Sequence, residues 1–561
     1  MAHDPHDGVA RGEAAVLGRL HHPAERLVPE DEPIAVGAAH ADGERAYQDR
    51  TLLSRRLVDL GELQRSGPSG NDGKSLHTQV TPRLGVSFYN RGVDYILAAA
   101  ILVSLFAAGH AVVYKRDSRS AAIWVLVVSV LPGAGAVLYA LLGVNRVQRR
   151  AAKLRRDRLR YRPVPQLAAP QLVAAVPGAN LAPLARMMSA VAERPLLQGN
   201  AVAPLVDGRE AYPAMLDAIE GARKSIALAS YIFQARGIGT RFVDALVRAH
   251  RRDVAVRVLV DDVDVRFTRF SAVKPLARAG VPTGVFNPPL VPARLNALNL
   301  RNHRKILVID GALGFTGGIN IDPQYWQPEQ PETAFRDLHF RLRGPVVAQL
   351  MDVFADDWHF ATDESLHGAA WFPGLEHHGA LLARVIEEGP DEAPDRLRWS
   401  IIGGLNAAQR AVRILTPYFV PDPPLVSALN AAALRGVEVD IMLPEKSDLP
   451  HVHWAGIHGL WQVLERGCRV WMSPGAFDHS KLMVVDGAWT LIGSGNWDAR
   501  SLRLNFELNV ECYCAELGAR MEALALERRA AARPVTLESV DKRSLPIKLR
   551  DGAARLFAPF L

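Results

Sequence analysis

The strongest constraint on the fold of this chain is a motif that occurs twice with the same internal spacing. The pattern is H-x-K-x4-D-x6-G-[GS]-x-N, with an apolar run, ILVI or LMVV, between the lysine and the aspartate. A pattern of this length does not recur by chance at corresponding places, so we expect a duplicated domain. The motif residues are His303, Lys305, Asp310, Gly317, Gly318 and Asn320 in the first copy, and His479, Lys481, Asp486, Gly493, Ser494 and Asn496 in the second.

The residues before each motif also repeat. SIALASYIFQ predicts a strand, residues 239–251 a helix, and AVRVLVDD a second strand; AVRILTPYFV, residues 424–435 and VEVDIMLP reproduce the series. Short apolar strands that alternate with helices are typical of parallel βαβ units. We therefore predict an α/β sheet in each half.

Local physical chemistry explains the spacing of the motif. A histidine and a lysine two residues apart on a strand project from one face, and the apolar run continues as a buried strand. The Asp-Gly step that follows favours a tight turn, which brings the glycine-rich segment back beside the strand. Glycine lets the backbone approach an anion, and an asparagine amide can donate to it. Each half thus predicts half of a phosphate pocket, with Asn320, Ser494 and Asn496 as phosphate-binding residues.

Two such halves, packed face to face about a pseudo-twofold axis, would place two histidines and two lysines around one phosphorus. One imidazole can attack a phosphodiester while the other protonates the departing alkoxide, and the lysines can stabilise charge on the oxygens. This chemistry requires no metal ion and no cofactor. For Asp310 and Asp486 a purely turn-forming role stays open beside a catalytic one. The predicted catalytic residues are His303, Lys305, Asp310, His479, Lys481 and Asp486.

Two apolar runs, residues 95–114 and 121–143, are each long enough to cross a bilayer as a helix, with aromatic residues near their ends. Burial of both helices in a soluble core is the alternative. Nine basic residues and one acidic residue follow between residues 146 and 162, whereas the connecting turn carries three basic residues. The positive-inside rule therefore predicts that the N-terminus and the long C-terminal part both lie in the cytoplasm.

We expect five regions along the chain. Residues 1–90 are polar and lack an apolar run, which predicts a disordered extension without a cleavable signal peptide. The net charge of +7 is compatible with nucleic acid or anionic lipid as a partner, but the basic run beside a predicted span favours lipid. The remaining regions are a transmembrane hairpin (91–145), a basic juxtamembrane segment and linker (146–195), a first domain (196–375) and a second domain (376–561).

Cysteines and isolated histidines carry no functional signal. The three cysteines suit neither a disulfide framework nor a metal set, and we expect them to be reduced core residues. His451 and His453 have no matching pair in the first half, which favours a structural role. The cysteines are Cys468, Cys512 and Cys514.

The two motifs resemble the HKD motifs of the phospholipase D superfamily, and the residues around them resemble bacterial cardiolipin synthases. The matching segments are NHRKILVIDG with GGINI, FRDLH with a later Gly-Pro, TPYFVP and NWDARSLRLNFE, together with the paired apolar runs that end in LPGAGAVLYALLG. The resemblance covers residues 95–561. It implies two phospholipase D-like α/β sandwich domains related by pseudo-twofold symmetry, behind a two-helix transmembrane hairpin.

The resemblance also implies an activity, a location and roles for individual residues. Two phosphatidylglycerol molecules would condense to cardiolipin and glycerol through a phosphatidyl-histidine intermediate, at the cytoplasmic side of the inner membrane and without a cofactor. His303 would be the nucleophile and His479 the general acid and base, although which histidine does which is left open. Asp337 and Glu507 would orient the histidines, because a carboxylate on the far ring nitrogen selects the tautomer.

Other functions stay open at this point. Water instead of a lipid alcohol would make the chain a phospholipase D that forms phosphatidic acid, and another alcohol would make a related synthase. A nuclease is disfavoured because paired spans serve no purpose with DNA, and a noncatalytic scaffold is disfavoured because both motifs are complete. The basic and apolar C-terminal residues 543–561 predict either a segment resting on anionic lipid or ordinary core docking. The oligomeric state is not predicted.

Overall fold

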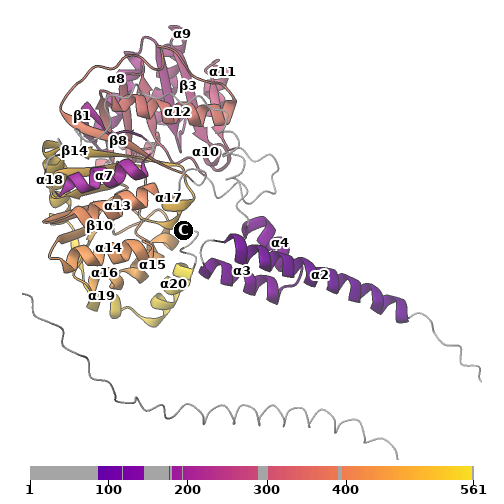
Figure 1. Ribbon diagram of the computed structural model, residues 1–561. Helices are drawn as coiled ribbons and strands as arrows, with labels where there is room; N and C mark the ends of the chain where they lie inside the picture. The colour runs from indigo at the N-terminus through magenta and orange to yellow at the C-terminus, as the bar shows by residue number, and fades with distance from the viewer. Residues whose placement is uncertain are drawn as a thin grey trace, which may run out of the picture. The chain divides into compact units, whose positions relative to one another are not determined.

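The computed structural model of this 561-residue chain describes residues 86–115, 118–143, 176, 178, 180–192, 194–287, 301–389, 395–556 and 558. The predicted N-terminal extension up to residue 85, the basic run and most of the predicted linker lie outside the described residues. Described segments form an N-terminal set of apolar helices and a large α/β region (Figure 1).

The first half of the α/β region alternates strands and helices as the sequence predicts. The predicted helix at 239–251 is α9, which begins after Gly237 at Ile238. The strands are β1 (Leu197–Val206), β2 (Ser225–Ser230), β3 (Ala255–Asp261), β4 (Thr283–Phe286), β5 (Ile306–Ile309), β6 (Leu313–Gly317) and β7 (Leu338–Arg343). The helices are α8 (Asp207–Glu220), α9 (Ile238–Arg251), α10 (Asp262–Phe267), α11 (Val273–Arg278) and α12 (Val346–Thr362), with 3-10 turns at Pro323–Tyr325 and Pro331–Thr333.

The second half repeats this series. Its predicted helix at 424–435 is α14, where Asp422 caps the N-terminus and Pro423 occupies the first turn. The strands are β8 (Leu381–Glu388), β9 (Ala411–Leu415), β10 (Glu438–Pro444), β11 (Arg469–Ser473), β12 (Leu482–Val485), β13 (Trp489–Gly493), β14 (Glu507–Tyr513) and β15 (Arg533–Val535). The helices are α7 (Leu181–Val191), α13 (Arg396–Ala407), α14 (Pro423–Leu434), α15 (Pro450–Gly459), α16 (Trp461–Leu464), α17 (Ala499–Arg503), α18 (Ala515–Ala530), α19 (Leu537–Asp541) and α20 (Leu545–Leu556).

All fifteen strands form one mixed sheet, in the order β15-β11-β10-β9-β12-β13-β14-β8-β1-β7-β6-β5-β2-β3-β4. The central antiparallel pair β1 and β8 joins the two halves. Outward from this pair, the first seven strands of the two halves correspond in order, and the second half adds the edge strand β15. Strands β2, β3 and β4 are parallel, as are β9, β10 and β11, which matches the predicted βαβ units.

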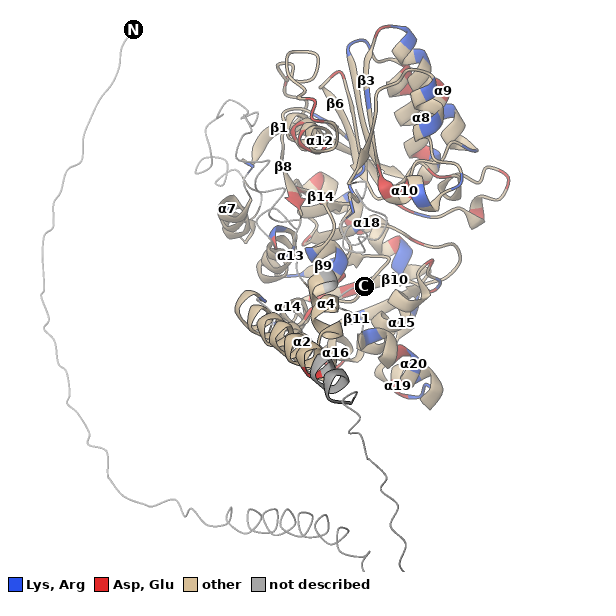
Figure 2. Cartoon of the chain, turned by 90° about the vertical axis from the view of Figure 1, so that its right-hand side faces the viewer, with Lys and Arg blue, Asp and Glu red and all other residues tan. Residues whose placement is uncertain are grey.

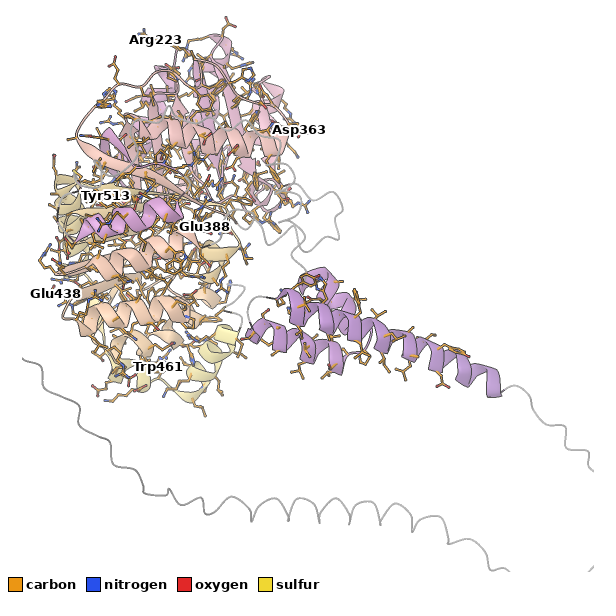
Figure 3. The ribbon with its side chains drawn as sticks, viewed as in Figure 1. Arg223, Asp363, Glu388, Glu438, Trp461 and Tyr513 are labelled. Atoms are coloured by element: carbon orange, nitrogen blue, oxygen red, sulfur yellow. The ribbon has the colours of Figure 1, made fainter. Side chains whose placement is uncertain are left out.

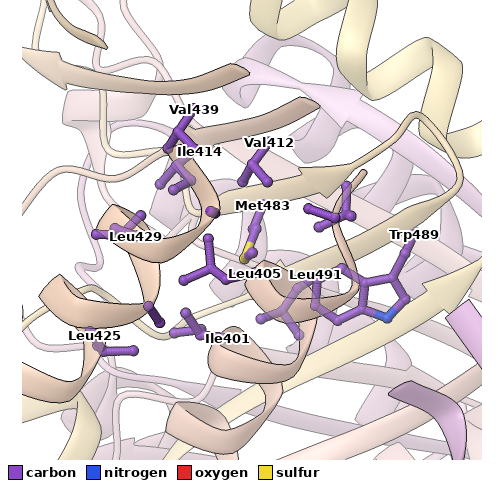
Figure 4. Packing of buried hydrophobic residues seen from close by; sticks show 14 of the residues in the cluster. Ile401, Leu405, Val412, Ile414, Leu425, Leu429, Val439, Met483, Trp489 and Leu491 are labelled. Atoms are coloured by element: carbon purple, nitrogen blue, oxygen red, sulfur yellow. The ribbon is translucent and has the colours of Figure 1, made fainter. Parts of the chain in front are cut away.

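Helices cover both faces of the sheet, and three apolar cores lie between the layers. Helices α8 and α9 pack on one face of the first half, and α7, α13 and α14 on one face of the second. Figure 4 shows part of the second core, where Leu405 of α13 and Leu429 of α14 meet Ile414 of β9. Helices α12 and α18 contribute to a single shared core on the opposite face. Side chains fill the space between these layers (Figure 3). This common core fixes the two halves against each other.

The N-terminal helices only partly match the predicted hairpin. Helix α2 (Val86–Tyr114) contains one segment long and apolar enough to cross a membrane, Asp94–Tyr114. The second predicted span is not one continuous helix: α3 (Ser118–Val130) ends before Pro132, and α4 (Ala134–Leu138) continues into one π-helical turn, Tyr139–Gly143. Proline has no amide proton and Gly133 adopts a positive φ of 79°, so the helix breaks there.

The break is held by side chains of α2. The Gly133 amide donates to Ser104 Oγ at 2.9 Å, and His110 Nδ1 lies 2.8 Å from the Tyr139 hydroxyl. Ala107, Ala111, Val128 and Ala136 form the small core between these helices. From Tyr95 to Tyr114 the large exposed side chains of α2 are aliphatic or aromatic, and this stretch contains no Lys, Arg, Asp or Glu (Figure 2).

Candidate active site

Each motif histidine pairs with a carboxylate from the other half of the chain. His303 Nδ1 lies 3.0 Å from Glu507 Oε2, and His479 Nδ1 lies 2.8 Å from Asp337 Oδ2. We call these the Glu507 pair and the Asp337 pair. All four side chains are buried. Since the two pairs cross between the halves, one composite site is built from both motifs.

Backbone hydrogen bonds enforce the crossing. The His303 amide donates to Phe506 O at 2.9 Å, and the His479 amide donates to Arg336 O at 2.7 Å. The residue before each carboxylate therefore binds the histidine of the other half. Asp337 and Glu507 were predicted to orient the histidines, but the prediction did not say which carboxylate contacts which histidine. The partners are 204 and 142 residues apart in the chain, so the spacing within each motif does not indicate the pairing.

The two motif lysines lie under the histidines. Lys305 Nζ donates to His303 O at 2.8 Å and sits 5.3 Å from the Tyr231 ring centroid, and Lys481 Nζ donates to His479 O. Burial lowers the pKa of Lys305 to about 7 and that of Lys481 to about 8, although nearby carboxylates oppose the effect. A bound phosphate would favour the charged lysines, so the pair is suited to hold an anion.

The two histidine pairs differ in their protonation. Burial alone would raise the pKa of Glu507, but interactions with His303, Lys305 and Ser494 hold it below its ordinary value. Burial raises the pKa of Asp337 to about 7, against the opposing charge of Lys481. Burial also lowers the pKa of His303 to about 4 and that of His479 well below its ordinary value. Glu507 is thus an anion beside a neutral imidazole, whereas Asp337, with a pKa of about 7, is protonated in about half of the molecules at neutral pH.

Hydrogen bonds around the carboxylates account for part of this difference. Glu507 accepts from Ser494 Oγ at 2.5 Å and from Asn505 Nδ2 at 3.1 Å. Asp337 accepts from the Leu338 amide at 2.7 Å, and Gly318 occupies the place that corresponds to Ser494. A Cβ atom on Gly318 would lie against both Asp337 carboxylate oxygens, which explains why this copy of the motif has glycine. The Ser494 hydroxyl is engaged with Glu507, which differs from its predicted contact with phosphate.

The two predicted phosphate-binding asparagines are buried at the site. Asn320 Oδ1 accepts from the Ile232 amide at 3.4 Å. Asn496 Oδ1 has no hydrogen-bond partner within the described part of the chain. Both side chains stay compatible with the predicted contacts to an anion.

Asp310 and Asp486 do not join the histidines. Both lie in the turn beyond β5 or β12, with φ of 52° and 53°. Asp310 accepts from the amides of residues 223–225 at 2.6–3.1 Å, and Asp486 accepts from those of residues 409–411 at 2.8–2.9 Å. Each carboxylate therefore ties the β-turn to the start of the neighbouring strand β2 or β9, which favours the turn-forming alternative.

Three tyrosines at the site were not predicted. The Tyr231 ring lies 4.9 Å from His303 and the Tyr418 ring 6.2 Å from His479, centroid to centroid. The Tyr325 hydroxyl lies 3.0 Å from His479 Nδ1 and competes with Asp337 for that nitrogen. Tyr231 and Tyr418 occupy equivalent places in SYIF and PYFV, a signal that the sequence contained.

The residues beside the histidines are supported by ion pairs of opposite polarity in the two halves. Arg304 donates to Asp357 of α12 at 2.8 Å, whereas Asp478 accepts from Arg528 of α18 at 2.7 Å. Asn302 and Ser480 complete the two clusters. In the first half the segment before β5 carries the cation and α12 the anion, whereas in the second half the segment before β12 carries the anion and α18 the cation.

Groups that could ligate a metal are absent from the residues that the structure describes: no three His, Cys, Asp or Glu side chains cluster suitably. Cys468 and Cys512 are buried, Cys514 is half-buried and all three are free thiols. His451 and His453 lie in α15.

A family model described as "Cardiolipin synthase, PLD-like domain" matches residues 215–358 and 401–527, which include both motifs. The major cardiolipin synthase ClsA of Bacillus subtilis is 31% identical, over 82% of this chain and 99% of its own length. A cardiolipin synthase of Listeria monocytogenes is 33% identical, over 65% of this chain and 76% of its own. The chain belongs to the cardiolipin synthase family. It is therefore a phosphatidyltransferase of the phospholipase D superfamily.

The fold agrees with this assignment. The crystal structure of phosphatidylserine synthase from Haemophilus influenzae superposes with a TM-score of 0.54 and 16% identity, over 68% of this chain and all of the other. Identity at this level shows the shared α/β fold and nothing more specific.

Proposed function

We propose that this cardiolipin synthase condenses two phosphatidylglycerol molecules into cardiolipin and glycerol through a phosphatidyl group carried on His303. The observation that carries the proposal is the difference between the two histidine pairs. Ionised Glu507 can only accept a hydrogen bond, so it keeps the His303 proton on Nδ1 and leaves a lone pair on Nε2. His303 is therefore the better nucleophile.

The Asp337 pair is suited to supply the proton. Asp337 holds a proton up to about pH 7 and can donate it to His479 Nδ1, which places the ring proton on Nε2. In the first step the His303 Nε2–P bond forms and the P–O bond to glycerol breaks; His479 Nε2 gives its proton to the alkoxide while the Asp337 proton moves to His479 Nδ1. In the second step His479 Nε2 takes a proton from the hydroxyl of another phosphatidylglycerol, whose oxygen displaces His303 from phosphorus, and Nδ1 returns its proton to Asp337.

The phosphate oxygens would lie against the lysines and asparagines. Lys305 and Lys481 are buried, and no carboxylate among the described residues accepts a hydrogen bond from either, so an entering phosphate would supply the anion that favours their charged forms. Asn320 and Asn496 would add amide donors. The residues therefore suit a mechanism in which side chains alone stabilise the transferred group.

The two domains, 196–375 and 376–561, are proposed to be related by a pseudo-twofold axis through the β1–β8 pair. The corresponding strand successions and the reciprocal histidine pairs support this. Within the predicted hairpin 91–145, segments 95–114 and 121–143 are proposed as two spans of the inner membrane. Ser104 satisfies the Gly133 amide at the break, as the interior of a bilayer requires.

The orientation of the hairpin follows from the charge asymmetry of the flanking residues, which puts the catalytic domains in the cytoplasm. A reporter fused after Leu561 tests it: a fluorescent protein active only in the cytoplasm should fluoresce, whereas a phosphatase active only outside should not. The opposite result would reverse the orientation.

No nucleic acid is expected as a substrate.

Product analysis tests the reaction. Purified protein in detergent is given labelled phosphatidylglycerol and a chelator, beside His303→Ala and His479→Ala. We expect cardiolipin and glycerol from the unmodified chain alone. Phosphatidic acid without cardiolipin would make the chain a hydrolase, in which water resolves the intermediate. A covalent labelled adduct trapped with His479→Ala but not with His303→Ala would support the assignment of the nucleophile, and the reverse would exchange the two roles.

A further inference from the structure

Helix α20 exposes a narrow stripe of leucines on one face. Leu545, Leu549 and Leu556 are spaced four and seven residues apart, which places them on one side of an α-helix. Their exposed fractions are 69%, 64% and 80%. We call these three residues the leucine face. Large apolar side chains that remain this exposed in a row mark an interaction surface rather than a packed core.

The other side of α20 is anchored firmly to the second domain. Asp551 is buried and accepts from Arg543 and Arg550 at 2.5 Å and 2.7 Å. The Arg550 guanidinium stacks 4.4 Å from the Trp454 ring centroid of α15. The contact with α15 holds the buried side of α20 against the second domain and leaves the leucine face outward.

This attachment lies next to the site. Ala554 and Ala558 pack against a small core formed by Tyr418, Val420, Val452, Ala455 and Phe477. The Phe477 ring is 5.7 Å from the His479 ring. The leucine face is thus connected to a catalytic histidine through two layers of side chains.

The charge of this segment favours one kind of partner. From Lys542 to Leu556 the chain has five basic residues and one acidic residue, the buried Asp551. A helix with an exposed apolar stripe and flanking cations is suited to the boundary between headgroups and acyl chains of an anionic bilayer. Phosphatidylglycerol, the proposed substrate, makes such a bilayer anionic.

The first domain has a corresponding exposed feature. Helix α10 follows β3 as α15 follows β10, and Phe267 and Phe270 at its end are 71% and 45% exposed, with Arg269 6.0 Å from the Phe270 ring. Asp261 links this element to the site, because it caps α10 and accepts from the Asn302 amide at 2.7 Å. Figure 1 places α10, α17, α15 and α20 along one side of the joined sheet.

We propose that the leucine face of α20 docks on the surface of an anionic bilayer and, with Phe267 and Phe270, holds the two catalytic domains against the membrane that contains the lipid substrate. The docking is distinct from anchoring by α2 and adds a second, interfacial contact. It rests on the proposed lipid substrate but not on which histidine is the nucleophile.

Activity toward two physical forms of the substrate tests the proposal. We expect Leu549→Asp in the full chain to lower the initial rate on phosphatidylglycerol vesicles about tenfold, because a carboxylate cannot enter the interface. The rate on short-chain phosphatidylglycerol, dispersed as monomers, should stay within a factor of about two, because the exposed side chain has no part in the chemistry. Leu434→Asp at the end of α14, where the leucine is 69% exposed, is the matched control and should change neither rate.

Three results would overturn the docking. An unchanged vesicle rate for Leu549→Asp would mean that the face does not touch lipid, an equal loss on monomers would mean that α20 only supports the site, and an equal vesicle loss for Leu434→Asp would mean a nonspecific charge effect. Failure of the unmodified chain on both forms of the substrate would instead count against the proposed function.

A fluorophore on Leu549→Cys gives a measurement independent of activity. In the full chain in phosphatidylglycerol vesicles we expect quenching by spin-labelled lipid and protection from iodide, both weaker in phosphatidylcholine vesicles. Full access to iodide would overturn the proposal. Protection that disappears as the protein is diluted in the membrane would do so too, by assigning the face to a second copy of the chain.

Discussion

At the scale of single residues, the site combines two nearly identical motifs with unequal surroundings. Both copies supply a histidine and a lysine, yet Glu507 accepts from the side chains of Ser494 and Asn505, whereas Asp337 accepts from the Leu338 amide. Hydrogen bonds to an ionised carboxylate lower its pKa, and burial without them raises it. Ser494 lies beside Glu507 and Gly318 lies beside Asp337. This single difference accompanies a lowered pKa for Glu507 and a raised pKa for Asp337 in a nearly symmetric site.

The protonation of Asp337 predicts how the rate depends on pH. Its pKa of about 7 lies above its ordinary 3.8, so the carboxyl is protonated below pH 7 and loses its proton as the pH rises through this value. Glycerol release in a single turnover should therefore slow above pH 7. Asp337→Asn should lower this rate by about 10²–10⁴-fold and remove the decline. A decline that persists in Asp337→Asn would assign the titration to another group.

The serine-glycine difference can be tested directly. Gly318→Ala should destabilise the protein and reduce activity strongly, because the new methyl group would displace the Asp337 carboxylate. Ser494→Ala leaves this packing intact and removes one hydrogen bond, which costs about 1–3 kcal/mol at the Glu507 carboxylate. Turnover and thermal unfolding should both be impaired more by Gly318→Ala than by Ser494→Ala. Equal effects would mean that the two positions are interchangeable.

At the scale of elements, substitutions in the turns after β5 and β12 can tell whether Asp310 and Asp486 have a structural or a catalytic role. Asp310→Ala removes an acceptor for three backbone amides and a residue suited to positive φ, so we expect a loss of about 1–3 kcal/mol in unfolding free energy. Turnover per folded molecule should be retained. Asp486→Ala, with its equivalent contacts, serves as the matched variant. Lost turnover with unchanged stability would restore the catalytic interpretation of the two aspartates.

The ion pairs between strands and helices belong to the same scale. Arg528→Met leaves the Asp478 charge buried and unpaired, which should cost about 3–5 kcal/mol of stability. Asp478→Asn added to Arg528→Met removes the stranded charge and places there the asparagine that the first half has at residue 302. Chemical denaturation should show partial recovery in the double variant. An additive loss would mean that the two side chains are not coupled.

At the scale of the whole molecule, the crossed pairs and the shared core make one chain one complete site. Each motif needs a carboxylate from the other half, and β1 and β8 join those halves within the same sheet.

Mixing two inactive variants tests this completeness. His303→Ala and His479→Ala, purified separately and combined in the same detergent or membrane, should show only the sum of their residual rates. Refolding the mixture from denaturant provides the control for slow exchange. Recovered activity in either mixture would show that two chains can share a site, as in a domain-swapped dimer.

Local patterns in the chain were sufficient for the βαβ units, the two motifs and the family resemblance. Their information lies in residues a few positions apart, such as His303 and Lys305 on one strand. The helix break at Pro132 could also have been predicted from the local sequence. We predicted a continuous span because residues 121–143 are apolar throughout.

The crossed histidine pairs, the function of the Ser494 hydroxyl and the unequal protonation of Asp337 and Glu507 emerged only in three dimensions. These properties depend on burial and on hydrogen bonds between groups far apart in the chain, as with His303 and Glu507, separated by 204 residues. The spacing within a motif determines neither the burial of a side chain nor its hydrogen bonds to distant residues. The charge that a buried group carries is set by the atoms packed around it, and those atoms come together only when the two halves share one sheet.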